Sequence, residues 1–351
     1  MKKFVFRTAA LFLAAVFLLS APVQAVSAGC AAVMDADTGE ILFEKNGSRR
    51  GLIASTTKIM SGLLICENCN MLSVVTVPPE AAGTEGSSMY LKTGEKLAVQ
   101  ELLYGMMLSS GNDAAVALAV YCSGSTEKFV QKMNERAAEM GLADTHFGNP
   151  HGLDSRENYS TAQDLAVLSA EAMKNPVFAK TVSTKTVRVG GRILTNHNRL
   201  LWQLEGAEGI KTGYTRAAGR ILCSCVRRNG RKIIIVTMND PDDWQDHRIL
   251  CEKSFSLYRQ QTAFRAGDSV GERRILSGIP DRVPLLAAGD FSCWLLPGES
   301  AKIRLPKPEF AYAPVVQGQD AGIAGVYIGE RRIGEIHLQY GITAEIEPDC
   351  P

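Results

Sequence analysis

Strand-like segments stand at both ends of the part of the chain before residue 262, and helical patterns fill the stretch between them. Residues 31–47 alternate between apolar and polar types around an Asp-Thr-Gly turn, which predicts a β-hairpin. Strand-like text returns at 185–193, 220–228 and 232–238. The early hairpin, the later strands and the helices between them must share one core. We therefore predict an α+β fold whose antiparallel sheet joins segments far apart in the sequence.

Helical patterns cover four segments between these strands. They run over residues 55–66, 97–122, 125–141 and 160–175. The sequence "SSGN" interrupts the second segment. Ser125 and Ser160 are the predicted N-caps of the third and fourth segments, Gly141 stops the third, and Pro176 follows the fourth.

The helical patterns stop at about residue 262. Short alternating runs separated by glycine and proline follow, for example over 266–276, 292–297 and 322–340. This pattern predicts a second, all-β domain over 262–351, behind a first domain over 29–261.

Residues 1–25 have the pattern of a secretory signal peptide. Basic residues precede an apolar run over 8–19, and Ala25 or Ala28 offers a small-residue cleavage site. An uncleaved anchor and a lipidated Cys30 in "SAGC" are the two alternatives. We expect an extracytoplasmic protein, secreted or associated with the cell wall. It should meet a membrane only if its N-terminus stays uncleaved or carries a lipid.

Net charge and cysteine content limit the kinds of ligand and site that the chain can have. The net charge of +1 provides no field that favours nucleic acid. Nine cysteines are an odd number, so at least one has no partner within the chain. Cys66 and Cys69 in "CENC" admit a redox pair, a zinc half-site or a local bridge. No second CxxC completes a zinc site, so we expect a structural or incidental role.

Ser55 and Lys58, in "ASTTKIM", are three residues apart in a predicted helix and should share one face. A serine hydroxyl becomes a good nucleophile only when a base takes its proton. A lysine can be that base if desolvation or a second cation lowers its pKa. Apolar Ile53 and Ile59 can supply the desolvation. Because the spacing is common by chance, it needs support from other motifs.

Two later motifs supply that support. Ser110 and Asn112 are two residues apart on a glycine-containing turn, so both can face one cleft. The motif "KTG" starts at Lys211 and is predicted to begin a strand. Its cation and hydroxyl can hold a carboxylate, Gly213 permits close approach of a ligand, and Lys211 can help to keep Lys58 neutral. The ordered trio SxxK, SxN and KTG is a specific signal.

At these motifs the chain resembles the serine D-alanyl-D-alanine carboxypeptidases, which are low-molecular-mass penicillin-binding proteins. The stretches "DADTGEILFEKN", "GSSMYLKTGEKL", "MGLADTHFGNPHGLD" and "GIKTGYTRAAGR" carry the same resemblance, and so does the β-rich tail. The resemblance implies a β-lactamase/transpeptidase-like catalytic domain over 29–261, followed by a small all-β domain over 262–351.

The resemblance also implies a reaction and its chemical groups. The substrates are implied to be peptidoglycan stem peptides ending in D-Ala-D-Ala, with β-lactam antibiotics as mimics and no cofactor. Ser55 is implied to be the acylated nucleophile and Lys58 its general base. Ser110 is implied to relay a proton to the leaving D-alanine.

Substrate binding is implied for a second group of residues. Asn112 is implied to bind the substrate's peptide backbone, and Lys211 and Thr212 to hold its terminal carboxylate. The backbone N–H groups of Ser55 and Tyr214 are implied to form the oxyanion hole. The sequence "EGSSMY" is implied to lie near the mouth of the cleft.

The chain departs from the family pattern in two places. Some members carry an arginine after the strand that follows KTG; only Arg248 is available in that region, and we assign it no role. Many members end in a basic amphipathic helix that lies on the membrane, whereas this chain ends in the acidic "TAEIEPDCP".

Other functions have weaker support. A class A β-lactamase needs Ser-Asp-Asn at 110–112 and a Glu-x-x-Leu-Asn motif, and the chain contains no Leu-Asn pair. A non-catalytic wall-binding protein of the same fold is the other alternative. Residues 267–271 match a nucleophile elbow, but strand-like text follows them. His146 and His151 lie near acidic residues without an HExxH motif, and we expect no metal site.

Overall fold

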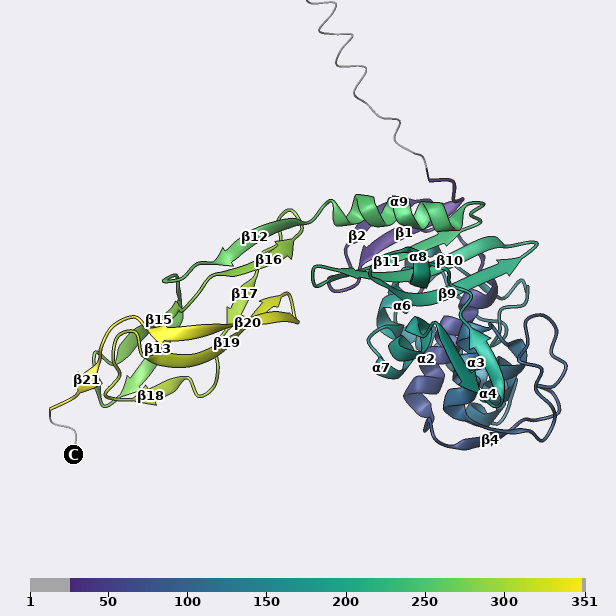
Figure 1. Cartoon of the computed structure of the whole chain (residues 1–351), viewed down its shortest axis with the longest axis horizontal. Coiled ribbons are helices and arrows are strands. Elements are labelled where there is room, and N and C mark those ends of the chain that lie inside the picture. Colours follow the sequence, from purple (N-terminus) through teal and green to yellow (C-terminus); the bar gives the residue numbers. More distant parts are fainter. Residues whose placement is uncertain (1–25, 349–351) are drawn as a thin grey trace, which may run out of the picture.

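The computed structural model describes residues 26–348, which form two regions (Figure 1). The predicted signal peptide at 1–25 lies outside the described residues. Helices and strands both occur up to Phe255, and from Arg259 to the end of the described chain the regular elements are strands. Within 26–348 no helix is long and apolar enough to cross a membrane. The fold is α+β, as predicted.

A five-stranded antiparallel sheet forms the centre of the first region. Its strands in spatial order are β2 (Ile41–Lys45), β1 (Cys30–Asp35), β11 (Arg231–Met238), β10 (Gly219–Arg228) and β9 (Ala207–Thr215). β1 pairs with β11, so that Ala32 lies opposite Val236. The prediction of a sheet between distant segments is therefore confirmed.

Eight helices with labels α2 to α9 lie in the described part of this region. They are α2 (Lys58–Asn68), α3 (Val99–Leu108), α4 (Asn112–Ser123), α5 (Thr126–Glu139), α6 (Ala162–Ala172), α7 (Pro176–Ser183), α8 (Leu200–Gln203) and α9 (Asp243–Phe255). The predicted break at "SSGN" separates α3 from α4. The predicted cap of α5 is also confirmed, because Ser125 Oγ accepts a hydrogen bond from Lys128 N at 3.2 Å.

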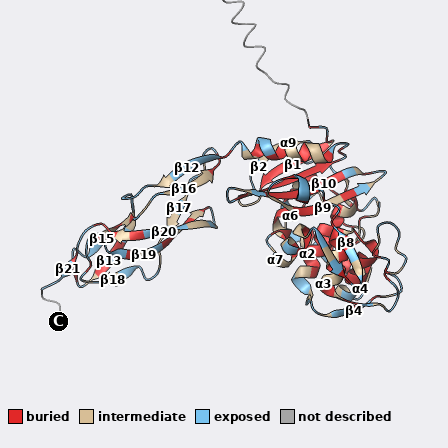
Figure 2. Ribbon diagram, viewed as in Figure 1, coloured by how far each residue is buried: buried red, intermediate tan, exposed pale blue. Residues whose placement is uncertain are grey.

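Helices cover both faces of the sheet, which explains why the sequences of β10 and β11 contain continuous runs of apolar residues. Ile221 and Ile234 point to the larger core, which contains residues of α2 to α6. Leu222 and Ile235 point to the opposite face, where they pack with Leu250 of α9. Successive strand residues alternate between faces, so both sets must be apolar. Figure 2 shows these strands buried between the helices.

One detail of the helix prediction is wrong, and helices α7 and α9 were not predicted. Thr161 rather than Ser160 caps α6, because its side chain accepts a hydrogen bond from Asp164 N at 3.0 Å. Pro176 lies just beyond the end of α6, as predicted, and it is also the first residue of the unpredicted helix α7, where its missing N–H costs nothing. Helix α9 was not predicted, because charged residues are so frequent in its sequence that no clear apolar periodicity remains.

Short strand pairs lie outside the main sheet. They are β3 (Gly51–Leu52) with β6 (Tyr159–Ser160), β4 (Val74–Thr76) with β5 (Lys96–Ala98), and β7 (Thr186–Val189) with β8 (Arg192–Thr195). The segment predicted as a strand over 185–193 thus folds largely into the β7–β8 hairpin. Its Gly190-Gly191 turn has positive φ at both residues.

The second region has its own sheets and its own core. Its strands are β12 (Arg259–Phe264), β13 (Ser269–Leu276), β14 (Gly278–Ile279), β15 (Arg282–Ala287), β16 (Phe291–Leu295), β17 (Lys302–Arg304), β18 (Phe310–Tyr312), β19 (Asp320–Ile328), β20 (Arg331–Tyr340) and β21 (Glu345–Ile346). Six of them form a sheet in the order β17-β19-β20-β15-β13-β18. Because strand β13 follows Gly267 and Asp268, the elbow-like sequence lacks the helix that a nucleophile elbow requires.

A buried ion-pair cluster, here called the junction, connects the two regions. Arg231 of β11 contacts Asp35 Oδ2 at 2.6 Å and Glu299 Oε1 of the second region at 2.9 Å. Tyr258 donates its hydroxyl proton to the same Asp35 oxygen at 2.5 Å. The junction therefore ties the sheet of the first region to the loop between β16 and β17.

Candidate active site

Ser55 lies in a 3-10 turn (Ala54–Thr57) that leads directly into α2. Lys58 is the first residue of α2, and its Nζ lies 3.0 Å from Ser55 Oγ. Ser55 is half-buried, whereas Lys58 is 0% exposed. The two side chains face each other, as the spacing predicts.

Two further oxygen atoms complete the surroundings of Lys58 Nζ. They are Asn112 Oδ1, at 2.7 Å, and the backbone carbonyl of His151. A neutral amine has two hydrogens and one lone pair. If the hydrogens go to these two acceptors, which cannot donate, the lone pair remains for the hydroxyl proton of Ser55. The geometry thus suits an amine that accepts a proton from Ser55.

The electrostatic environment favours that neutral form. Burial lowers the pKa of Lys58 well below its usual value, and the positive charge of Lys211 lowers it further, against a weaker opposing effect of Asp113. Burial also lowers the pKa of Lys211, to about 7. Two cations close together in a dry site cannot both keep their protons easily, which is the effect predicted from the sequence.

Asn112 lies beneath the cleft and does not line it. It is 3% exposed, and its Nδ2 donates a hydrogen bond to the carbonyl of Glu85 at 2.6 Å while its Oδ1 accepts from Lys58. The hydrogen bond to Glu85 thus fixes the amide group, and its oxygen is held against Lys58. Its expected contact with a substrate backbone stays a prediction. Ser110 has a positive φ of 60° and does line the cleft.

The KTG motif lies in the interior of β9, so the prediction that it begins a strand is wrong. Thr212, Gly213 and Tyr214 line the cleft, and Tyr214 is 67% exposed. Lys211 is 1% exposed, and its Nζ donates a hydrogen bond to the carbonyl of Thr212 at 2.8 Å. The ammonium group thus lies just below the cleft wall formed by Thr212.

Two glycines allow the backbone to approach Ser55 closely. A Cβ on Gly213 would lie 3.2 Å from Ser55 N, so β9 packs directly against the 3-10 turn. Gly152 has a φ of +94°, and a Cβ there would lie 1.9 Å from Ala54 O. No larger residue fits at Gly152 without moving the turn that carries Ser55. The sequence "NPHGL" therefore has the structural role expected for it.

Ser55, Ser110 and Thr212 share one open cleft of about 970 Å³. Sequence reasoning placed Ser87, in "EGSSMY", near the cleft, but it missed the rest of the outer wall, which consists of Thr195, Asn196, His197, Arg199, Trp202, Arg220, Asp243 and Trp244. The pairing of Arg220 with Tyr214 in the β9–β10 hairpin was an available signal, since residues opposite KTG must border the same site. The α8 and α9 residues had no comparable signal.

An arginine that the sequence analysis did not consider lines the cleft. Arg220 lines the cleft, contacts Asp243 Oδ1 at 2.6 Å and lies over the Trp244 ring. Arg248 points elsewhere and donates a hydrogen bond to Gln203 Oε1 at 2.8 Å. Arg248 is therefore not among the residues that line the cleft.

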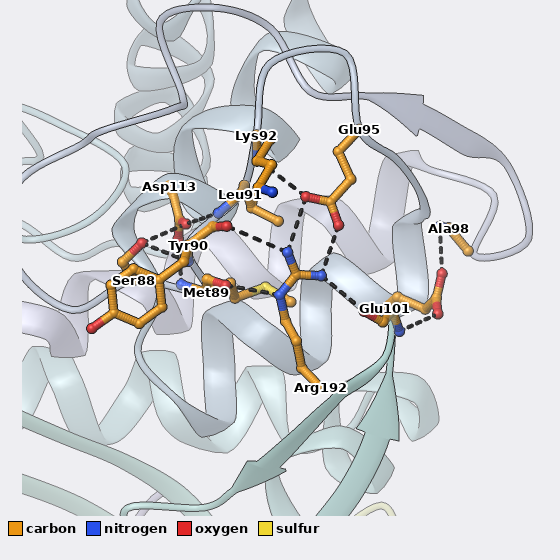
Figure 3. A network of polar contacts seen from close by, with 11 residues as sticks. Ser88, Met89, Tyr90, Leu91, Lys92, Glu95, Ala98, Glu101, Asp113 and Arg192 are labelled. Atoms are coloured by element: carbon orange, nitrogen blue, oxygen red, sulfur yellow. Dashed lines mark hydrogen bonds and ion pairs between the residues drawn. The ribbon is translucent and has the colours of Figure 1, made fainter.

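The loop that carries "EGSSMY" borders the cleft through Ser87 and is held by a polar network (Figure 3). Asp113, in the first turn of α4, accepts hydrogen bonds from Ser88 Oγ at 2.6 Å and Met89 N at 3.0 Å. Arg192 of β8 donates to Met89 O at 2.8 Å and pairs with Glu95 at 2.7 Å. The start of α4 and the β7–β8 hairpin thereby fix the loop beside Ser110.

No set of three or more histidine, cysteine or acidic side chains within residues 26–348 is arranged to hold a metal ion. His151, a candidate considered from the sequence, is half-buried beside Lys58 instead. Burial and the charge of Lys58 lower the pKa of His151 to about 4. Its backbone carbonyl, not its ring, accepts a hydrogen bond from Lys58.

Comparisons with known proteins agree with this arrangement. Residues 16–242 match the peptidase S11 family model, described as D-alanyl-D-alanine carboxypeptidase. The chain is 32% identical over 308 residues to D-alanyl-D-alanine carboxypeptidase DacF of Bacillus subtilis, covering 83% of this chain and 79% of that protein. It is 32% identical over 352 residues to DacD of Escherichia coli, covering 95% and 88%.

Solved structures resemble both regions together. Penicillin binding protein 5 from Haemophilus influenzae matches with a TM-score of 0.66 and 28% identity, over 92% of this chain and 98% of that one. The D-alanyl-D-alanine carboxypeptidase DacD from Francisella tularensis matches with a TM-score of 0.65 and 26% identity, over 92% and 94%. The shared fold, the matched family model and the identity to these relatives agree, and the chain belongs to the peptidase S11 family of D-alanyl-D-alanine carboxypeptidases.

Proposed function

We infer that this protein is a serine carboxypeptidase that removes the terminal D-alanine from peptidoglycan stem peptides ending in D-Ala-D-Ala. The observation that carries this inference is the 3.0 Å contact between Lys58 Nζ and Ser55 Oγ, in a site that lowers the pKa of Lys58. Family membership supports the same activity.

In the proposed reaction, Ser55 Oγ attacks the carbonyl carbon of the penultimate D-alanine and gives its proton to Lys58 Nζ. The backbone N–H groups of Ser55 and Tyr214 stabilise the oxyanion. Ser110 relays a proton to the departing nitrogen, and the C–N bond breaks to release D-alanine. Water then hydrolyses the Ser55 ester with Lys58 as the base.

The terminal carboxylate is proposed to bind at the wall formed by β9. Thr212 lines the cleft and Lys211 lies directly behind it, so a hydroxyl and a cation converge on one place. A carboxylate there would stabilise the protonated form of Lys211 and strengthen the hydrogen bond. Asn112 is proposed to contact the peptide backbone once the substrate displaces one of its present partners.

We propose that residues 29–261 contain the whole reaction and that 262–351 form a separate β domain, since each region has its own apolar core. The substrate lies outside the cytoplasmic membrane, so we also propose that residues 1–25 direct export. An N-terminus that stays uncut or lipidated would add a membrane attachment. The partners are stem peptides and β-lactams.

The test uses purified protein and a peptide ending in D-Ala-D-Ala. Release of D-alanine, together with a penicillin adduct found on Ser55 by mass spectrometry, would support the proposal. Absence of both would favour a non-catalytic wall-binding protein. A fluorescent penicillin should remain bound for minutes, because no glutamate motif activates water for deacylation. Complete loss of the label within a second would instead favour a β-lactamase.

A further inference from the structure

Three cysteines gather at the end of the α2–α4 helix pair that lies away from Ser55. Cys66 lies in the last turns of α2, Cys69 is its C-cap residue, and Cys122 lies in the last turn of α4. All three are free thiols, half-buried at the edge of the larger core. They are thus both close-packed and accessible from solvent, unlike the fully buried Cys223 and Cys251.

The helix geometry brings Cys69 and Cys122 together. α2 packs against α4, and their first residues, Lys58 and Asn112, share a hydrogen bond of 2.7 Å. At the other end, Cys69 follows the last residue of α2 and Cys122 lies in the last turn of α4, so the two thiols are neighbours. The two helices therefore run in the same direction from the cleft, with the catalytic contact at one end and the thiol pair at the other.

The three thiols differ in reactivity. Interaction with the neighbouring Cys69 thiol lowers the pKa of Cys122 to about 6 despite burial, and the charge of Lys132 on α5 acts in the same direction. The same interaction raises the pKa of Cys69 while both thiols are present. Burial and the negative charge of Glu67 raise the pKa of Cys66 to about 12. Since the thiolate is the nucleophile in disulfide exchange, Cys122 is the reactive member and Cys66 is the inert one.

We propose that Cys69 and Cys122 form a reversible disulfide that staples together the far ends of α2 and α4, with a small-molecule or protein disulfide as the oxidant. This inference is independent of the reaction proposed for Ser55. The "CENC" sequence thus supplies one partner, Cys69, to a cysteine more than fifty residues away in sequence, and Cys66 does not pair with it.

The disulfide between Cys69 and Cys122 would form in two thiol–disulfide exchange steps. The Cys122 thiolate attacks one sulfur of the oxidant, which breaks the oxidant's S–S bond, forms a mixed disulfide and releases one thiolate. Cys69 then loses its proton and attacks Cys122 Sγ, forming the internal S–S bond and releasing the second thiolate. The two cysteines lose two electrons, and the oxidant becomes two thiols as its thiolates take up protons.

The staple should stabilise the part of the chain that builds the cleft. It closes a loop that contains α3, the "EGSSMY" loop and Ser110, which restricts the unfolded chain. We expect oxidation to raise the Tm of the full chain by about 5–10 °C. The acylation rate of Ser55 should change little, because the Lys58–Asn112 contact is already formed.

The test compares fully reduced protein with protein treated with glutathione disulfide. Peptide mapping under non-reducing conditions should identify one pair of peptides linked through Cys69 and Cys122, lighter by two hydrogens. The Cys66→Ser variant is the matched control, and it should keep both the link and the rise in Tm. Cys69→Ser and Cys122→Ser should lose both, while reaction with fluorescent penicillin shows that these variants are folded.

Three outcomes would overturn the proposal. They are a linked peptide pair between Cys66 and Cys69, glutathione adducts on Cys122 without an internal link, and an oxidised wild-type protein whose Tm equals that of the reduced form.

Discussion

The cleft and the junction both bury cations, yet only the junction surrounds its cation with carboxylates. Arg231 is 2% exposed and contacts Asp35 and Glu299. Lys58 is 0% exposed, and its contacts are a hydroxyl, an amide oxygen and a backbone carbonyl. Burying a positive charge costs free energy at both places. Carboxylates offset that cost at Arg231, whereas the hydrogen-bond partners of Lys58 are uncharged groups.

The pKa values change in opposite directions at the two places. Burial acts to lower the pKa of Arg231, but hydrogen bonds and negative charges from Glu299 and Asp35 outweigh it and raise that pKa. Burial lowers the pKa of Lys58, and Lys211 reinforces the effect. A buried cation that contacts carboxylates stays charged and holds structure together, whereas one that contacts only uncharged groups can lose its proton and is suited to act as a base. Changes in the cleft should thus alter rates, and changes at the junction should alter stability.

The largest expected effect is on the rate, at Ser55. We expect Ser55→Ala to lower D-alanine release by more than about 10³-fold, because within residues 26–348 the hydrogen-bond partners of Lys58 Nζ include no other hydroxyl or thiol. The free energy of unfolding should change by less than about 1 kcal/mol, since only one hydroxyl is lost. Ser183→Ala, at a half-buried serine of α7 that does not line the cleft, is the control and should keep full activity. More than a few per cent of residual turnover would contradict the assignment.

The second effect tests whether Lys58 acts as a base or as a charge. Lys58→Arg should slow acylation by fluorescent penicillin about 10²–10⁴-fold, nearly as much as Lys58→Met. Arginine cannot be deprotonated at working pH, so it restores charge without restoring a base. Stopped-flow labelling measures this rate. Near-normal acylation in the arginine variant would make Lys58 an electrostatic residue and weaken the contrast with Arg231.

At the junction the expected effect is on stability. Arg231→Gln should lower the free energy of unfolding by about 3–5 kcal/mol, because Asp35 and Glu299 are left buried without their partner. Arg332→Gln breaks the exposed pair with Glu335 and should cost less than about 1 kcal/mol. Denaturant unfolding gives both values. If Arg231→Gln also slows acylation of Ser55, the two places are not independent.

A smaller effect concerns pH and stability. The pKa of Lys211 is about 7 in the folded protein and 10.5 by its ordinary value, so the unfolded chain binds more protons between these values. Stability should therefore rise with pH across that window, by up to about 1.4 kcal/mol per pH unit for this group. Lys211→Met should flatten the rise between pH 7 and pH 8.5, whereas Arg231→Gln should preserve it. Parallel profiles for wild type and Lys211→Met would refute the lowered pKa.

The smallest expected effect is on substrate choice. If Lys211 and Thr212 hold the terminal carboxylate, amidating the substrate's C-terminus should lower kcat/KM at least tenfold, or by about 1.4 kcal/mol. The comparison uses the same peptide as free acid and as amide. Equal rates would indicate that Lys211 serves only to lower the pKa of Lys58.

Sequence patterns by themselves determined the α+β class, the strand character of β10 and β11, and the cap of α5 at Ser125. They also identified Ser55, Lys58, Ser110 and KTG as parts of one site. These features depend on residues close together in the sequence or on short motifs. The periodicity of apolar residues and the spacing within a motif therefore indicate them directly.

Only the tertiary structure decided which groups surround Lys58 and lower its pKa. Its two acceptors, Asn112 Oδ1 and His151 O, are 54 and 93 residues away along the chain, and no local pattern records that distance. The approach of β9 to the 3-10 turn, which requires Gly213, depends on the same packing. The weakly amphipathic α9 forms because the sheet needs an apolar cover, so its own sequence could not reveal it. Burial is a property of the assembled core, and burial is what lowers the pKa of Lys58 and Lys211.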